Sequence, residues 1–533
     1  MVDFGKAHLN AVFDDRLPRR NGVQLLHSWG SPLETDPIRR MTRSQTLHTS
    51  AEDRVPSIQK IGYGLGSAID MWGHWLYPTL AFPVFNIFLG VPPWMVSLAL
   101  MLLRILDAVC DPFFGWLSDN TRGRFGRRRP YILVGSILAG IGLPLLFCVS
   151  PGWGSTDFHL NLLFWKGNVT VPHYFWFMLG SSALYVPVMS CFNLPYQSLG
   201  AELTPDYHER TSVMMYRNSI QQVIMVAIHF SQQFITLSLF IDPMTGKPDI
   251  LRGAQVYTTI LGILIIIAGV AVFSLVRERY YTKVVERNQA AIPLRETIWM
   301  ALRCQPFRIQ LIITLAFASG TSMTGTLSFY DTAYYVCRGD IAAAGRWTAL
   351  MGIAGMSLGF PGILLFGYIA RKHGKLITML LVLFTAMLAF AGTWWFYDPN
   401  HPWLQLLAMG SFSFSAAAFW TLLGSVNADV IDYDELETGK RREGAFASCS
   451  SWIMKLGLAL GAGACGLMLS ATGFDAKLEG AQSSQTLLMI RVLVAGVPIL
   501  GCVVAVIALR YFPLTQDRMA EIRRQLELRR GQV

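Results

Sequence analysis

The sequence predicts an all-α membrane protein with twelve transmembrane helices in two six-helix bundles. Three features of its 533 residues predict this class: 15% of the residues are charged, 53% are hydrophobic, and long apolar runs recur along the chain. A helix that spans a bilayer needs about 20 largely apolar residues, and the chain has room for twelve. This composition excludes a disordered chain, a coiled coil and an ordinary soluble enzyme.

Twelve apolar runs, separated by charged or Pro/Gly-rich breaks, are the candidate spans. The first six cover residues 61–90, 94–118, 131–150, 173–199, 214–240 and 255–276. The second six cover residues 309–335, 347–369, 376–397, 403–426, 445–471 and 487–511. We therefore expect an N-terminal bundle over 61–276 and a C-terminal bundle over 309–511, joined by a cytoplasmic linker over 277–308. A poorly ordered cytoplasmic extension over 1–60 and a basic cytoplasmic tail over 512–533 complete the prediction.

The basic residues are distributed unevenly between the two sides of the membrane. If the N-terminus is cytoplasmic, 34 Lys and Arg residues fall on the cytoplasmic side and six on the other. Such a bias orients a membrane protein with its basic loops inside, so both termini are expected in the cytoplasm. The net charge of +10 is therefore explained by topology, and nucleic-acid binding is not expected. The first sixty residues also lack the apolar core of a signal peptide.

The second predicted span carries three ionisable residues on one helix face. Arg104, Asp107 and Asp111 lie within about 60° of one another around the helix axis, at 100° per residue. Each would cost about 2.5–3.5 kcal/mol near the bilayer centre, and such residues usually mark ion or substrate paths. One interpretation is a structural Arg–Asp ion pair, which leaves the second carboxylate unexplained. The other is a pair of carboxylates that holds a cation or shares a proton.

Other polar residues also lie within the predicted spans. Asp70 in the first span is suited either to a hydrogen bond with a polar solute or to one between two helices. Ser190, Asn193 and Gln197 recur at helical spacing in the fourth span and form one polar stripe. Lys455 stands among glycines in the eleventh span, where a lone Lys requires a carboxylate or a polar cavity.

Three collinear sequence blocks resemble a known transporter family. The blocks are Asp107–Pro130 (DAVCDPFFGWLSDNTRGRFGRRRP), Leu194–Tyr196 followed by Glu202–Thr211, and the segment from Ala428 to Lys455. They are similar to the glycoside-pentoside-hexuronide:cation symporters, the melibiose permease family of the major facilitator superfamily. The resemblance covers about residues 60–511. It implies the major facilitator fold and a location in the plasma membrane, expected to be the inner membrane of a bacterium.

The resemblance implies a site for the coupling cation. Asp107 and Asp111 would be its carboxylates and Ser190 a hydroxyl ligand, because hard cations prefer oxygen. Lys455 matches the family lysine that pairs with the carboxylates when the site is empty. Cys110 stands where the melibiose-type pattern has Asn, and sulfur is a poor ligand for Na⁺. H⁺ is therefore favoured over Na⁺ as the coupling ion, with no other metal and no cofactor expected.

The solute site departs further from the family pattern. Met71 and Asn193 stand where sugar-binding carboxylates are expected, so galactoside specificity is not implied. By residue type alone Trp420 would be a core residue, but it matches the family's sugar-stacking tryptophan. Arg217 is suited to bind an acidic group through two hydrogen bonds. The predicted solute-binding residues are Asp70, Asn193, Gln197, Arg217, Trp420, Ser450 and Ser451.

The resemblance also implies an inner gate, built from charged residues near the cytoplasmic ends of the helices. Opposite charges from the two bundles would pair while the carrier faces outward and separate when it opens inward. The alternative is that these residues are solvated charges that only set the topology. The residues at the gate positions are Arg210, Asp429, Asp432, Arg441 and Glu443.

The predicted function is cation-coupled symport of a sugar or glycoside by alternating access. Symport of a lysolipid or another amphiphile remains an alternative, because lysolipid symporters are relatives of this family. A membrane enzyme or a non-transporting sensor is the alternative of another class. Against an enzyme stand the lack of a His-Glu-x-x-His motif and of a phosphate-binding glycine loop. The expected partners are a small solute and membrane lipids, without an obligate protein partner.

Overall fold

The computed structural model describes residues 54–121, 125–162, 165–204, 207–278, 302–439 and 443–530. Most of the predicted N-terminal extension and of the central linker therefore lies outside the described residues. All the described residues belong to one unit, which extends from Ala51 to Val533.

Long helices occupy the positions of all twelve predicted runs. Those of the first half are α2 (Ser57–Ala81), α3 (Pro93–Asn120), α4 (Arg129–Leu145), α5 (His173–Glu202), α6 (Tyr207–Phe234) and α7 (Ile250–Leu275). Those of the second half are α10 (Gln305–Tyr330), α11 (Ile341–His373), α12 (Lys375–Phe396), α13 (Gln405–Thr438), α14 (Glu443–Ala471) and α15 (Ser484–Arg510). The predicted C-terminal tail contains a further helix, α16 (Gln516–Arg530).

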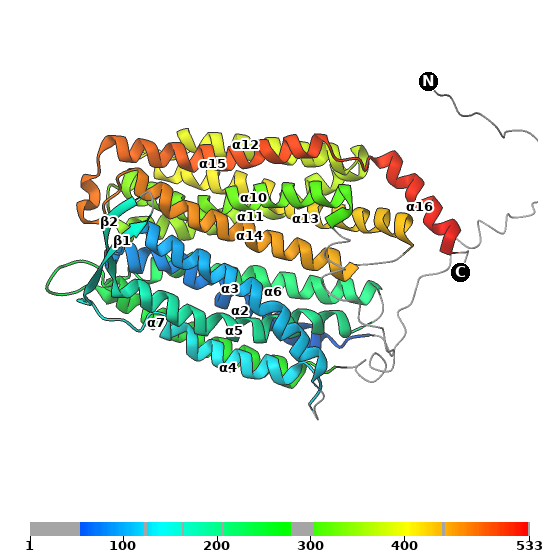
Figure 1. The fold of residues 1–533 in the computed structure, drawn as a ribbon, viewed down its shortest axis with the longest axis horizontal. Helices are drawn as coiled ribbons and strands as arrows, with labels where there is room; N and C mark the ends of the chain where they lie inside the picture. The colour runs from blue at the N-terminus through cyan, green and yellow to red at the C-terminus, as the bar shows by residue number, and fades with distance from the viewer. Residues whose placement is uncertain are drawn as a thin grey trace, which may run out of the picture. The chain divides into compact units, whose positions relative to one another are not determined.

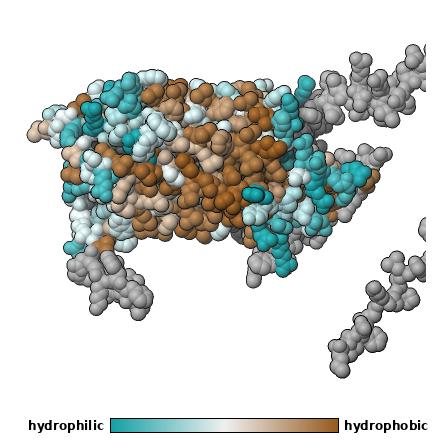
Figure 2. Space-filling model, turned by 90° about the horizontal axis from the view of Figure 1, so that it is seen from above, coloured by the Kyte–Doolittle hydropathy of each residue, from teal (hydrophilic) through white to brown (hydrophobic). Residues whose placement is uncertain are grey.

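Within the described part of the chain, nine helices are long and apolar enough to cross a membrane. Helix α4 is apolar but has only 17 residues. Helices α2 and α6 are not among the nine, and both carry several polar side chains along their length. Figure 2 shows one face of the molecule, on which a broad hydrophobic band lies between hydrophilic ends. This surface suits a protein that crosses a bilayer.

A β-hairpin is the one departure from the predicted all-α class in the described residues. Strands β1 (Ser155–Leu162) and β2 (Trp165–Pro172) pair antiparallel between α4 and α5, with Ser155 opposite Pro172. The apolar pattern does not predict the hairpin because this loop has no apolar run of membrane-spanning length. The hairpin lies at one end of the helices, which we call the hairpin end, and α16 lies at the other, the α16 end (Figure 1).

The helices lie side by side in two groups that follow the two halves of the sequence (Figure 1). In the first half α4 packs on α7, α2 on α6 and α3 on α5. In the second half α10 packs on α15, α11 on α13 and α12 on α13. The halves meet where α3 packs on α14 and where α6 packs on α11. These two helix pairs carry the contacts on which any functional site between the halves depends.

The hydrophobic cores show where the halves are joined. One cluster contains the first half together with residues from the hairpin end of the second half, among them Leu327, Tyr330 and Leu469. The other cluster lies within the second half and includes Met519 and Ile522 of α16. The two halves therefore share one continuous hydrophobic core at the hairpin end.

Two short π-helices strengthen this join. Segment η1 (Phe82–Phe88) continues α2, and η3 (Asp331–Val336) continues α10, so each half has a π-helix after its first long helix. Tyr330 Oη donates a hydrogen bond to Asn86 Oδ1 at 2.6 Å, and the Tyr330 ring meets Phe82 edge to face. Such π-helical segments are rare and occur frequently at functional sites. In this protein η1 contacts the end of α10, next to η3, across the boundary between the halves. Short 3-10 helices, η2 (Ser238–Phe240), η4 (Pro402–Leu404) and η5 (Ala476–Ala481), lie in the connections.

Glycines allow some helices to approach backbone to backbone. A Cβ atom on Gly262 of α7 would lie 2.3 Å from the carbonyl oxygen of Gly140 in α4. A Cβ on Gly140 would lie 2.5 Å from the carbonyl oxygen of Gly262. Both separations are too short for any side chain, so the packing of α4 on α7 requires glycine at both positions.

We expect Gly262→Ala to destabilise the protein. Overpacking a tight contact costs about 1–3 kcal/mol, and the new methyl group has no room beside Gly140. The matched control is Gly496→Ala in α15, because a Cβ there meets no atom within 4 Å. Thermal unfolding in detergent should show a lower melting temperature for Gly262→Ala alone. Equal melting temperatures for the two variants would refute the requirement for glycine at this contact.

Candidate functional site

A lysine lies between two carboxylates where α3 meets α14. Lys455 Nζ is 2.9 Å from Asp107 Oδ2 and also forms an ion pair with Asp111. The Asp107 side chain is 3% exposed, and those of Lys455 and Asp111 are partly buried. The sequence predicts a carboxylate or a polar cavity beside Lys455, and the structure places two carboxylates there. The pairing matters because one unpaired charge in a low-dielectric interior would be strongly destabilising.

The remaining residues of the predicted cation site surround Asp107. Ser190 Oγ on α5 donates to Asp107 Oδ1 at 3.5 Å, a long hydrogen bond. Arg104, one helical turn from Asp107, has Nη1 4.0 Å from Asp107 Oδ2. Cys110 is a free, partly buried thiol on the same helix. Asp111 Oδ1 is buried and accepts no hydrogen bond from the residues that the structure describes, so this carboxylate retains an unused acceptor.

These groups have the chemistry of a site for a small cation. Two carboxylates and a hydroxyl provide oxygen ligands from α3 and α5, and Lys455 already supplies a positive charge to both acids. A proton or Na⁺ bound to the acids would replace the charge of Lys455, because like charges at this distance repel. Among the described residues no group of three or more His, Cys, Asp or Glu side chains forms a metal site.

Asp70 is paired with a neighbouring helix. Arg217 Nη2 on α6 donates to Asp70 Oδ2 at 3.2 Å, and His74 Nδ1 lies 3.3 Å from Asp70 Oδ1. The guanidinium of Arg217 also lies over the Tyr196 ring, 5.6 Å from its centroid. Of the two interpretations of Asp70, the geometry shows the helix–helix contact. Two of the predicted solute-binding residues, Asp70 and Arg217, thus bind each other.

The two clusters are linked through Arg104. Its Nη2 donates to the carbonyl oxygen of His74 at 3.2 Å, while its Nη1 faces Asp107. A small cavity of about 20 Å³ lies between His74, Arg104 and Asp107, enough for one water molecule. A continuous chain of ionisable residues therefore crosses four helices: Arg217, Asp70, His74, Arg104, Asp107, Lys455 and Asp111.

The other predicted solute-binding residues do not line one common cavity in the structure. Gln197 Nε2 donates to Asn193 Oδ1 at 2.8 Å within the stripe on α5. Trp420 is 37% exposed and stands edge to face against Phe317 and Phe419. On α14, Ser451 is exposed, and Ser450 Oγ is buried without a hydrogen-bond partner among the described residues.

The predicted inner-gate residues are only partly described. Arg441 lies outside the described residues, as do the side chains of Arg210 and Glu443. Asp432 is half-buried near the α16 end of α13. Asp429 accepts from Lys375 Nζ at 2.5 Å, and both residues belong to the second half. The prediction had Asp429 face a charge of the first half, and it did not include Lys375.

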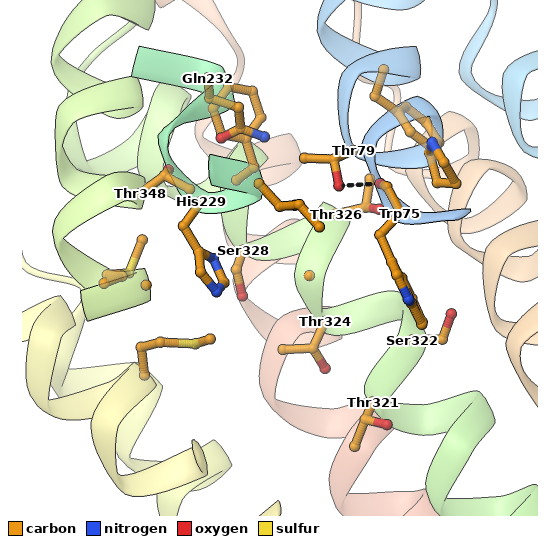
Figure 3. A pocket seen from close by; sticks show the side chains of 18 of the residues that line it. Trp75, Thr79, His229, Gln232, Thr321, Ser322, Thr324, Thr326, Ser328 and Thr348 are labelled. Carbon is orange, nitrogen blue, oxygen red and sulfur yellow. Dashed lines mark hydrogen bonds between the residues drawn. The ribbon is translucent and has the colours of Figure 1, made fainter. Parts of the chain in front are cut away.

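A larger cavity lies between the halves near the hairpin end, and the motifs of the sequence do not predict it. Its volume is about 360 Å³, and helices of both halves line it. Figure 3 shows the His229 ring and the side chains of Ser328, Thr324 and Thr321 around the same open space. None of the predicted solute-binding residues lines this cavity.

One signal in the sequence could have found this cavity. The run from Thr321 to Ser328, TSMTGTLS, carries five hydroxyl side chains in eight residues of a predicted span. Those at 321, 324 and 328 recur at helical spacing and so share one face. His229 and Gln232, by contrast, sit in a polar stretch of α6 that has no distinctive pattern. Only the packing of α6 against α11 places them at the cavity.

Comparison with known proteins identifies the family. The family described as "MFS/sugar transport protein" matches residues 62–516. The inner membrane symporter YicJ of Escherichia coli (strain K12) is 26% identical over 478 residues, covering 88% of this chain and 94% of that protein. The isoprimeverose transporter of Lactiplantibacillus pentosus is 24% identical over 463 residues, covering 86% and 89%.

A solved structure shows the same fold. A bacterial homologue of the human lysosomal transporter Spinster, in an inward-facing and unoccupied conformation, has a TM-score of 0.60 at 13% identity, covering 87% of this chain and 98% of that one. The predicted major facilitator fold and the resemblance to sugar symporters are thereby confirmed. The protein is a multi-pass integral membrane transporter and not an enzyme. With its family matched over most of its length, the chain belongs to the MFS/sugar transport proteins.

Proposed function

We propose that this protein is a cation-coupled symporter that carries a sugar or glycoside by alternating access, with Asp107, Asp111 and Lys455 as its coupling site. The observation that carries the proposal is the position of Lys455 between the two carboxylates of α3, of which Asp107 is buried. The family and the names of the relatives, a symporter and an isoprimeverose transporter, support this class of solute.

The proposed topology has twelve spans with both termini in the cytoplasm. The bias of Lys and Arg toward one side supports this orientation, which makes the α16 end cytoplasmic and the hairpin end external. Helices α2, α4 and α6 are not among the nine apolar helices of spanning length, and we include them because each lies at the position of a predicted apolar run. The proposed bundles cover residues 61–276 and 309–511, as the sequence pattern predicts.

Coupling follows from the cost of moving uncompensated charge. Two bare carboxylates have a high free energy in a closed, low-dielectric state. Their free energy is lower when they are protonated or form ion pairs. Lys455 compensates the acids when no cation is bound. A bound cation takes over that role and releases Lys455, which changes the contact of α3 with α14. The empty and the fully loaded carrier can then reorient, while the partly loaded carrier is held back.

H⁺ is the proposed coupling ion, with Na⁺ as the alternative. Asp107 and Asp111 both contact Lys455, so protonation of either acid weakens an ion pair that joins the halves. A site for Na⁺ needs several oxygen ligands, and Cys110 offers sulfur where the related pattern has an amide oxygen. Ser190 contributes one hydroxyl oxygen in either case.

Alternating access also needs gates at both ends. At the hairpin end the bond from Tyr330 to Asn86 and the shared core hold the halves together. At the α16 end we propose that charges of the two halves form the inner gate, with Lys375 setting the position of Asp429. The other proposed inner-gate residues are Arg210, Asp432, Arg441 and Glu443.

Uptake into liposomes by the purified protein tests the proposed function. We expect accumulation of at least one of isoprimeverose, a methyl pentoside and a methyl glucuronide when a proton gradient is imposed. A Na⁺ gradient without a pH difference should drive little uptake if H⁺ is the coupling ion. Uptake of lysophosphatidylcholine is measured to test the alternative that the solute is an amphiphile. Uptake of lysophosphatidylcholine alone, or of no probe under any gradient, would refute sugar symport.

Asp111→Asn should abolish gradient-driven accumulation and leave solute exchange in place. An amide carries no negative charge, so it cannot alternate between pairing with Lys455 and binding the cation. Movement of the ion is then no longer coupled to movement of the solute. The matched control is Asp157→Asn, which changes an exposed carboxylate of the hairpin. Uptake and exchange are both measured in liposomes with an imposed gradient. Full concentrative uptake by Asp111→Asn would remove this residue from the coupling site.

Tyr330→Phe should favour opening at the hairpin end. A neutral hydrogen bond contributes about 1 kcal/mol, which corresponds to about a fivefold change in the population of the open state. Hydrogen–deuterium exchange of residues 82–88 and 331–336 should therefore rise. Tyr257→Phe is the control, since Tyr257 donates to Ala227 within the first half. Unchanged exchange in Tyr330→Phe would show that this bond does not hold the end closed.

A further inference from the structure

We propose that Asp331 is a second proton-binding site, at the hairpin end of the second half, and that its proton holds this end closed. The inference goes beyond the proposed coupling site, because Asp331 lies in the other half of the chain from Asp107 and Asp111. It rests on the proposed function in one respect, which is that the hairpin end faces outside and opens during alternating access. Protons on the outside would then regulate access to the carrier from that side.

Asp331 is a buried carboxyl group without a hydrogen bond. It is 2% exposed, and its Oδ1 accepts no hydrogen bond from the residues that the structure describes. Its one charged neighbour in that part of the chain is Arg491 of α15, which donates its hydrogen bonds to other groups. An ionised carboxylate in such surroundings is costly, and the group binds a proton instead. Asp331 therefore carries a proton while the hairpin end is closed.

Arg491 is held in place by two aromatic residues. Its Nη1 donates to Tyr335 Oη at 3.1 Å, and its Nη2 donates to the carbonyl oxygen of Trp394 at 2.5 Å. Its guanidinium lies 4.2 Å from the ring centroid of Tyr335 and 4.5 Å from that of Trp394. Its Nε is buried and has no hydrogen-bond partner among the described residues. A bond from this Nε to Asp331 requires a rearrangement of η3 or of the aromatic pair.

The other elements around η3 supply no compensating charge to Asp331 in the described part of the chain. Tyr397, which follows α12, is the other titratable residue that interacts with Asp331, and a tyrosine is neutral at physiological pH. On α11 the charged residues of this end are Asp340 and Arg346, and neither interacts with Asp331. From α13 comes the uncharged Gln405, which accepts a hydrogen bond from the residue after Asp331.

The position of Asp331 links its proton to the contact between the halves. It is the first residue of η3 and directly follows Tyr330, whose hydroxyl donates to Asn86 of the first half at 2.6 Å. Helix α10 has no charged residue after Arg308, near its other end. A charge on Asp331 therefore has to reach water or Arg491, and either requires the packing around Tyr330 to loosen. Loss of the proton thus opens the hairpin end, and its return closes this end.

Acid should consequently favour closure of the hairpin end. The closed state binds one proton more than the open state, so a rise in pH favours opening. One proton changes the ratio of closed to open protein by at most about tenfold per pH unit. The effect ends below about pH 4, where an exposed aspartic acid is protonated too. An exposed ion pair between Lys247 and Glu479 also joins the halves at this end, but acid would break that pair and favour opening.

Hydrogen–deuterium exchange of residues 82–88 in the purified protein tests this site. These residues form η1 in the first half, so their own sequence is the same in every variant. Asp331→Asn keeps the shape of the side chain and is uncharged at every pH. The matched control is Asp157→Asn, which removes an exposed carboxylate at the same end. Variants and unmodified protein are compared at equal pH, from acidic to mildly alkaline, so that the intrinsic effect of pH on exchange cancels.

We expect η1 to exchange equally in the unmodified protein and in Asp331→Asn at acidic pH. As the pH rises, the unmodified protein should exchange faster than Asp331→Asn, by up to about tenfold per pH unit, and Asp157→Asn should match the unmodified protein throughout. The infrared spectrum of the unmodified protein should contain the C=O band of a protonated carboxyl group that Asp331→Asn lacks. A ratio of exchange that stays constant with pH, or the absence of that band, would overturn the site.

Arg491→Gln provides a second test that does not require Asp331→Asn to fold. Removing the positive charge makes the ionised form of Asp331 less favourable, so the pH at which η1 begins to exchange faster should move upward. Faster exchange at every pH, without that upward move, would indicate simple destabilisation and overturn the site. None of these measurements needs a solute or a gradient. Normal uptake with pH-independent exchange would overturn the proton site alone, and the expected exchange without uptake would overturn symport alone.

Discussion

The structure depends on one constraint: charge inside a low-dielectric bundle must be compensated locally. Lys455 could not lie within α14 without Asp107 and Asp111 facing it from α3. Because these helices come from different halves of the chain, the ion pair is also a contact between the halves. A change in its protonation therefore changes both the local charge and the packing of α3 on α14.

The same constraint extends the cluster across the molecule. Arg104 balances Asp107 and reaches the backbone of His74, and Asp70 is balanced by Arg217 on α6. Each charge has a partner on another turn or another helix. The cavity near the hairpin end adjoins this chain of charges through Arg104. The cavity and the charged cluster are thus separated by a single side chain.

The proximity of Asp107, Asp111 and Lys455 could be anticipated because its signal was local. Asp107 and Asp111 lie four residues apart on one helix face, and a lone Lys455 in an apolar run demands a counter-charge. The pairing of Asp70 was not predictable in the same way. Nothing near Asp70 in the sequence shows that Arg217, 147 residues later, will pair with it. Likewise the position of Gln232 at the cavity depends on α6 packing against α11.

The sequence by itself determined the helix positions, the distribution of charge and the family, because apolar runs, basic loops and spaced motifs are properties of neighbouring residues. The tertiary structure decided which polar groups are paired, where the halves share a core and where a cavity remains. These depend on contacts between residues far apart in the chain, such as Asn86 with Tyr330. Periodicity shows which face of a helix is polar, but only packing determines what that face meets.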